Sequence, residues 1–166
     1  MPVSLSSHKR ERFNPIDQVE DILSPNDWFF DRRSDKEMAV EVPGSWCDFG
    51  LFFSWSENLN ALHFSCALDM RVQPEIITKV YELVAKLNER LWIGHFAVWI
   101  EEGIPMFRHT INCNPDEIDS SHIRNLINIA IRECNQYYPA FQFVIWGGKT
   151  VDNALSRSII ETQGQA

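Results

Sequence analysis

The sequence predicts an α+β fold in which one antiparallel sheet packs against helices. Two observations support the sheet: apolar and polar residues alternate along residues 37–69, and two further apolar segments flank a tight turn near residue 103. A third observation supports the helices, because apolar residues recur at spacings of three and four in other segments. We therefore expect the order α-β-β-β-β-α-β-β-α-α. A single domain would span residues 14–163, after a disordered tail at residues 1–13.

The first helix is expected to begin at Asn14-Pro15. Asparagine is a favoured N-cap, and proline suits the first helical position, where the missing N–H would have no partner in the helix. The apolar positions of its inner side are Ile16, Val19, Ile22 and Leu23. Ser24-Pro25 ends the helix, because the residue before a proline disfavours the helical conformation.

Four strands are expected next, and three of them alternate apolar with polar residues. Their ranges are Trp28 to Asp31, Glu37 to Val42, Trp46 to Trp55 and Ala61 to Asp69. Pro43-Gly44 and residues 56–60 supply short turns between neighbouring strands. This pattern is typical of an antiparallel meander with one buried face.

A central helix beginning at Pro74 is expected to lead into a hairpin at residues 95–111. The hairpin strands are apolar on both sides, since Phe96 and Val98 face one way while Ala97 and Trp99 face the other. On the returning strand, Phe107 and Met106 oppose each other in the same manner. A strand that is apolar on both sides is covered on both sides, either by its own helices or by a partner.

A third helix is expected from Asp119, with an apolar stripe that continues across Pro139 to Ile145. We interpret residues 119–145 as one helix kinked at Pro139, which removes a hydrogen bond and displaces the carbonyl group of Asn135. The alternative is a helix that stops at residue 138, followed by a strand, because β-favouring residues crowd residues 141–145. Thr150 then caps a last helix, with Val151, Leu155 and Ile159 expected along its inner side.

Charge and cysteine usage indicate a reduced cytoplasmic protein that does not bind nucleic acid. The chain carries a net charge of −8, but residues 1–14 carry +2, so the remainder carries −10 and repels phosphate backbones. The short basic tail either stays solvated or touches an acidic surface. The four cysteines contain no C-x-x-C pair and fall at apolar positions, where a free thiol packs as a small hydrophobe. Neither an apolar signal segment nor a membrane-spanning run is present in the sequence.

No motif in the sequence assembles a reaction centre. The five histidines lack the H-x-H or H-x-x-x-H spacing of zinc sites, and His95 with His109 is interpreted as a strand pair instead of a metal site. His63 and Cys66 point to opposite sides of one strand. Residues 147–150 (GGKT) lack the upstream glycine of a phosphate loop. Arg108 is expected to pair with Glu41 or Asp48, with an anion site as the alternative.

The chain resembles the bacterial YbjN family of sensory transduction regulators. The segments that carry the resemblance are Phe30-Asp31-Arg32, Val40-Glu41-Val42, Trp46-Cys47, residues 64–71 (FSCALDMR), residues 84–96, residues 102–109 (EGIPMFRH) and residues 138–149 (YPAFQFVIWGGK). The resemblance implies a fold like that of type III secretion chaperones, an α/β sandwich with helices against a curved antiparallel sheet, usually paired as a dimer. It implies a regulatory or chaperone-like binding protein without catalytic residues.

The leading hypothesis is a non-catalytic protein without a cofactor that binds an unidentified protein partner and forms a two-fold symmetric homodimer. The two-sided hairpin places the expected interaction surface at Trp92, Trp99, Met106 and Phe107. The alternative is a small-molecule sensor or a cryptic enzyme whose pocket lies between sheet and helices. That pocket would be lined by Trp46, Trp55, Trp92 or Trp99.

Overall fold

Six strands form one antiparallel sheet in the computed structural model, which describes residues 13–112 and 114–163. The strands are β1 (Phe30–Ser34), β2 (Glu37–Pro43), β3 (Asp48–Ser56), β4 (Ala61–Ala67), β5 (His95–Trp99) and β6 (Ile104–Asn112). Their order across the sheet is β1-β2-β3-β4-β6-β5. The hairpin β5–β6 is therefore added to the meander through its second strand, and β1 and β5 are the two edges.

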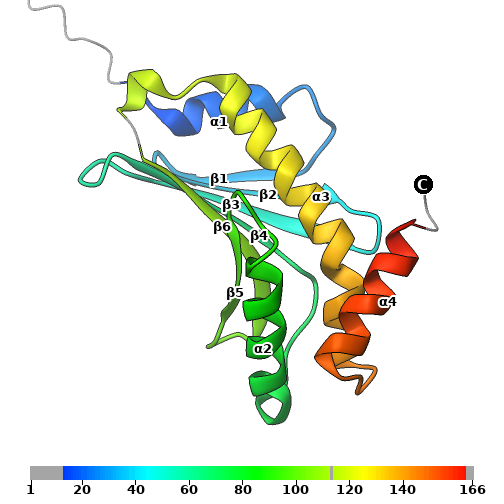
Figure 1. The fold of residues 1–166 in the computed structure, drawn as a ribbon. Coiled ribbons are helices and arrows are strands. Elements are labelled where there is room, and N and C mark those ends of the chain that lie inside the picture. Colours follow the sequence, from blue (N-terminus) through cyan, green and yellow to red (C-terminus); the bar gives the residue numbers. More distant parts are fainter. Residues whose placement is uncertain (1–12, 113, 164–166) are drawn as a thin grey trace, which may run out of the picture.

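Four helices complete the fold: α1 (Pro15–Leu23), α2 (Ile77–Asn88), α3 (Ser120–Ile145) and α4 (Val151–Gln163). Two short 3-10 turns, η1 (Pro74–Ile76) and η2 (Pro115–Glu117), precede α2 and α3. Figure 1 shows α1 and α3 on the same side of the sheet, with α4 against the second half of α3. The expected α+β class and element order are confirmed. Apart from Phe13, the expected tail lies outside the described residues.

Side chains alternate between the two faces along each strand, and the face that carries the buried apolar residues is covered by helices. Phe53 pairs with Phe64 between β3 and β4, and Phe107 pairs with Phe96 between β6 and β5, all four side chains being buried. The Phe96 ring centre lies 5.4 Å from that of Phe141 in α3. These contacts join the hairpin to the helix layer.

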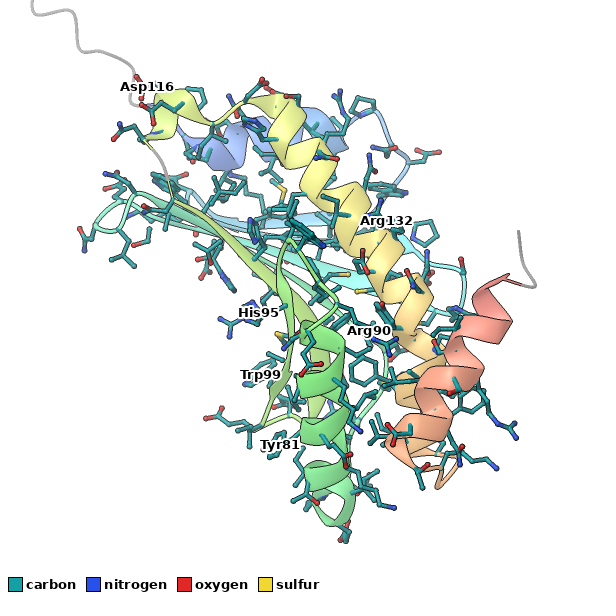
Figure 2. All side chains as sticks on the ribbon, in the orientation of Figure 1. Tyr81, Arg90, His95, Trp99, Asp116 and Arg132 are labelled. Carbon is teal, nitrogen blue, oxygen red and sulfur yellow. The ribbon has the colours of Figure 1, made fainter. Side chains whose placement is uncertain are left out.

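The opposite side of the sheet is called the open face here, because no helix of the described chain covers it. On its central strands it carries Gly50, Phe52 and Ser54 of β3, His63, Ser65 and Ala67 of β4, and Met106, Arg108 and Thr110 of β6. Figure 2 shows His95 and Trp99 of β5 projecting on the side of the sheet away from α3. One side of the expected two-sided hairpin is thus covered by the chain's own helices, and the other side is not.

The helix α3 confirms that one helix continues across Pro139 and excludes the alternative strand. It runs without interruption from Ser120 to Ile145, with Pro139 inside it. The Asn135 carbonyl cannot receive the usual helical hydrogen bond from residue 139, and it accepts one from the Trp46 indole Nε1 at 2.9 Å instead. The Asn135 side chain accepts a second bond from the Ser45 N–H at 2.8 Å. The β2–β3 turn is therefore attached to α3 one turn before Pro139.

This attachment explains why β3 begins later than expected. The chain at Trp46 turns instead of extending, with the Gly44 N–H donating to the Cys47 carbonyl at 2.9 Å. Smaller boundary differences occur at β1, which is shifted toward Ser34, and at β4, which ends at Ala67. In α4, Ile159 is 38% exposed, so its expected inward position is wrong; Ala154 and Ser158 are buried there instead.

Candidate interaction surface on the sheet

The structure separates the four residues expected at the interaction surface. Trp99 and Met106 lie together on the open face, where Trp99 is 49% exposed. Phe107 is fully buried on the covered face, because neighbouring residues of a strand point to opposite sides. Trp92 lies between α2 and β5 and is fully exposed. Sequence reasoning missed Phe52, a 38% exposed aromatic residue of β3 that shares this face.

Small and large apolar side chains alternate at the centre of the open face. Two hollows result, of about 800 Å³ and about 460 Å³. Gly50, Phe52 and Ala67 are among the residues that line the larger one. Trp99 and Met106 line both hollows. Accessible aromatic and methionine side chains around a depression are typical of a protein-binding surface.

Basic side chains gather at the β4–β6–β5 end of the open face. Arg108 is in register with His95 on one side and with Ser65 on the other, while His63 lies two residues further along β4. His95 is thus aligned with Arg108 and not with His109, contrary to the expected histidine pair. The Nδ1 atom of His63 lies 3.0 Å from the Thr110 hydroxyl oxygen. Burial lowers the pKa of His63, and the charges of Arg108 and His95 lower it further.

We expect the free energy of unfolding to fall as the pH is lowered through the ordinary histidine pKa of 6.5. A lowered pKa means that folded His63 binds its proton less readily than the unfolded chain does. The stability contributed by His63 is therefore complete above pH 6.5. It decreases as the pH falls from 6.5 to the lower pKa of folded His63. Urea unfolding at several pH values should show a smaller pH dependence for His63→Gln than for the wild type. His122→Gln, at an exposed histidine of α3, is the matched control and should keep the wild-type dependence.

Two carboxylates lie at the opposite end of the same face, where Arg33 of β1 also lines the larger hollow. Glu41 of β2 and Asp48 of β3 are exposed and line the larger hollow. Neither of them forms an ion pair with any described residue, and the same is true of Arg108. The expected pairing of Arg108 with Glu41 or Asp48 is therefore wrong, because β4 lies between β6 and the strands that carry these carboxylates.

The free edge of β5 is partly closed by a side chain. Asn88, the last residue of α2, accepts a hydrogen bond from the Phe96 N–H at 2.7 Å and donates one to the Phe96 carbonyl at 3.1 Å. The amide thus takes the place of a neighbouring strand at this position. Natural proteins protect sheet edges in comparable ways against pairing with another chain. The edge of β5 is therefore less accessible to a further strand at Phe96 than the open face is to side-chain contacts.

The four tryptophans proposed for a pocket do not gather at one place. Trp55 is buried in the core, Trp46 is attached to α3, Trp92 is exposed in a loop, and Trp99 lies on the open face. Across residues 13–112 and 114–163, no three histidine, cysteine or acidic side chains converge as metal ligands would. Cys66 and Cys134 are free, buried thiols whose sulfur atoms lie 3.5 Å apart, and burial raises the pKa of Cys134. The open face itself presents apolar and charged side chains.

These features define a class: an α+β protein in which helices cover one face of an antiparallel sheet and no helix of the described residues covers the other. Residues 15–143 match the family model YbjN, described as "Putative bacterial sensory transduction regulator". Because the match spans most of the chain, the protein belongs to the YbjN family. A comparison with curated proteins gave no match. In the part of the chain that the structure describes, no helix combines the length and the apolar character needed to cross a membrane.

Proposed function

We propose that this protein is a cytoplasmic regulator that acts by binding another protein through the open face, in the manner of a chaperone and without catalysis or a cofactor. The observation that carries the proposal is the uncovered apolar centre formed by Phe52, Trp99 and Met106. Contiguous exposed apolar surface is uncommon on soluble monomers and marks binding sites. Membership of a family of sensory transduction regulators supports the same function.

The composition of the surface fits a protein partner better than a nucleic acid. Aromatic residues, methionine and arginine are the side chains most enriched at protein interfaces, and Trp99, Met106 and Arg108 lie close together on the open face. The net charge of −8 disfavours a phosphate backbone. Trp99 is the expected centre of the interaction, because large aromatic side chains contribute most where they become fully desolvated.

Affinity capture from a native bacterial lysate should recover a specific protein with the wild type and lose it with Trp99→Glu. The carboxylate would need to be desolvated within an apolar contact, so we expect at least a tenfold loss of bound partner. Trp146→Glu is the matched control: Trp146 is 57% exposed but lies at the end of α3, away from the open face. Trp92→Glu tests whether the loop before β5 contributes to binding.

Capture that is equal for Trp99→Glu and Trp146→Glu would show that the open face is not the binding surface. Failure of every folded variant, and of the wild type, to recover any protein would contradict the proposed function as a whole.

A second candidate function, the sensing of a small molecule, is favoured by the larger hollow alone. Its volume of about 800 Å³ lies within the range of ligand sites, and Phe52 and Trp99 supply apolar walls. A metabolite that raises the melting temperature of the wild type but not of an Ala67→Trp variant would support this function. The bulky side chain of that variant would occupy space at the lining of the hollow.

A further inference from the structure

Two polar side chains that stand next to each other on the open face have no hydrogen-bond partner in the described chain. Ser65 of β4 is only 6% exposed, and its hydroxyl makes no hydrogen bond to another described residue. Arg108 of β6 is in register with Ser65 and is partly buried, yet its guanidinium group makes neither a hydrogen bond nor an ion pair with a described residue. Buried polar groups normally have partners, so two neighbouring exceptions indicate a group that binds from outside.

The same two side chains belong to a row of hydrogen-bond donors across three strands. His95 of β5 is in register with Arg108 on the side away from Ser65, and Figure 2 shows it projecting from the side of the sheet opposite α3. Opposed side chains of neighbouring strands have Cβ atoms about 5 Å apart, so a group bound over Arg108 is within reach of both neighbours. Arginine, histidine and serine all donate to a carboxylate, and a guanidinium group can do so through two parallel bonds.

No carboxylate of the described residues pairs with Arg108, although Glu101 lines the same hollow of about 460 Å³. Arg108 is in register with His95 at one end of β5, whereas Glu101 follows Trp99 beyond the other end. His95 and Trp99 are four residues apart, which is about 13 Å along an extended strand. The two charges therefore stand at opposite ends of this hollow.

The surface between these two ends is apolar. Ala97 and Met106 are paired between β5 and β6, and they line the hollow together with Val98, Trp99 and Ile100. A single small anion would cover the basic end and leave this surface exposed. A peptide segment can reach both, because every second residue of an extended chain faces the same side at intervals of about 7 Å.

We propose that Arg108, Ser65 and His95 bind a carboxylate of the protein partner, within an acidic segment whose neighbouring residues are apolar and cover Met106 and Trp99. The inference rests on the proposed function, since it takes the open face as the binding surface, and it adds the chemistry of the segment that binds there. One carboxylate beside Arg108 is compatible with the net charge of −8, because exposed charges further away than about 8 Å are largely screened at physiological salt.

Glu101 gives the bound segment one orientation. Its carboxylate, at the far end of the hollow, repels a second acidic residue. The acidic residue of the partner therefore lies over Arg108, and its apolar residues lie toward the turn between β5 and β6.

Selection from a display library of short random peptides tests this chemistry. Peptides selected by the wild type should contain an aspartate or glutamate close to aromatic or aliphatic residues. Selection on Arg108→Gln should lose the preference for the acidic residue. Arg124→Gln is the matched control, because Arg124 is an exposed arginine of α3, on the helix side of the sheet, and its loss changes the net charge equally.

One selected peptide with capped ends and its analogue, with an amide in place of the carboxylate, then give a double-mutant cycle. In calorimetric titrations the acidic peptide should bind the wild type at least about tenfold more tightly than the analogue, and the two should bind Arg108→Gln equally. Ser65→Ala should weaken binding of the acidic peptide about three- to tenfold. The same variant should leave the urea midpoint unchanged, because the Ser65 hydroxyl makes no hydrogen bond within the described chain.

Selected peptides without acidic residues, or equal affinity of both peptides for the wild type, would overturn the inference. Inorganic phosphate or acetate that binds at Arg108 as tightly as the peptide does would also overturn it, since the site would then serve a small anion. Lysate capture that depends on Trp99 but not on Arg108 would remove this inference and leave the proposed function standing. If the folded wild type binds neither a peptide nor a lysate protein, both the inference and the proposed function are wrong.

Discussion

Phe96→Ala is expected to lower the free energy of unfolding by about 3–5 kcal/mol, the usual loss when a fully buried phenylalanine is truncated. Phe96 is 1% exposed, and its ring meets those of Phe107, Tyr137 and Phe141 at centre distances of 5.8, 6.0 and 5.4 Å. Truncation would leave a cavity where β5 and β6 meet α3. Because a domain of this kind is stabilised by only about 5–15 kcal/mol in total, the loss is a large fraction.

Trp99→Ala, three residues further along the same strand, is the matched control and should cost about 1 kcal/mol or less. Its side chain is half exposed on the open face, where truncation creates no cavity. Urea unfolding should be repeated at several protein concentrations, since any self-association would add to the apparent stability. A small loss for Phe96→Ala, or an equal loss for both variants, would contradict the assignment of the two faces of β5.

Period-two alternation was sufficient to predict which hairpin residues share a face, but not which face the helices cover. It placed Phe96 opposite Trp99, and Phe107 opposite Met106, as the structure shows. The choice between the faces depends on the path of α3 over the sheet, which is a tertiary feature without a local signal. For that reason Phe107 was grouped with Trp99 although it lies in the core.

Strand order had a similar consequence for Arg108. Glu41 and Asp48 are expected as its partners on neighbouring strands, but β6 joins the sheet beyond β4, and neither carboxylate forms an ion pair with Arg108. Phe52 was missed because alternation directs attention to the other face of its strand. Every second residue of β3, from Phe49 to Trp55, is apolar and buried, and Phe52 lies between them on the face where polar residues are expected.

Pro139 shows where sequence reasoning was correct and yet incomplete. A proline within a continuous apolar stripe predicted a kinked helix and a displaced Asn135 carbonyl, and α3 confirms the helix. The donor that satisfies this carbonyl, the Trp46 indole, comes from 89 residues earlier in the chain. Contacts of such sequence separation leave no periodic pattern. The segment around Trp46 was consequently interpreted as the start of a strand.

We expect Trp46→Phe to lower the free energy of unfolding by about 1–3 kcal/mol in the wild-type background, because the Asn135 carbonyl loses its donor in a partly buried place. In a Pro139→Ala background the loss should be smaller, since residue 139 then has an N–H that can bond the same carbonyl. Phenylalanine keeps an aromatic ring near Tyr138, whose ring centre lies 6.4 Å from that of Trp46. The difference between the losses caused by Trp46→Phe in the wild-type and Pro139→Ala backgrounds therefore measures the hydrogen bond more than the ring contact.

Urea unfolding of the wild type, the two single variants and the double variant gives the interaction energy, which should be about 1 kcal/mol. Trp55→Phe combined with Pro139→Ala is the control: Trp55 is also buried, but its indole makes no hydrogen bond to α3 among the described residues, so these two changes should be additive. Additivity of Trp46→Phe with Pro139→Ala within about 0.3–0.5 kcal/mol would mean that the indole is not what satisfies the carbonyl freed by the proline. The kink in α3 would then be independent of the β2–β3 turn, and another contact would have to hold that turn against the helix.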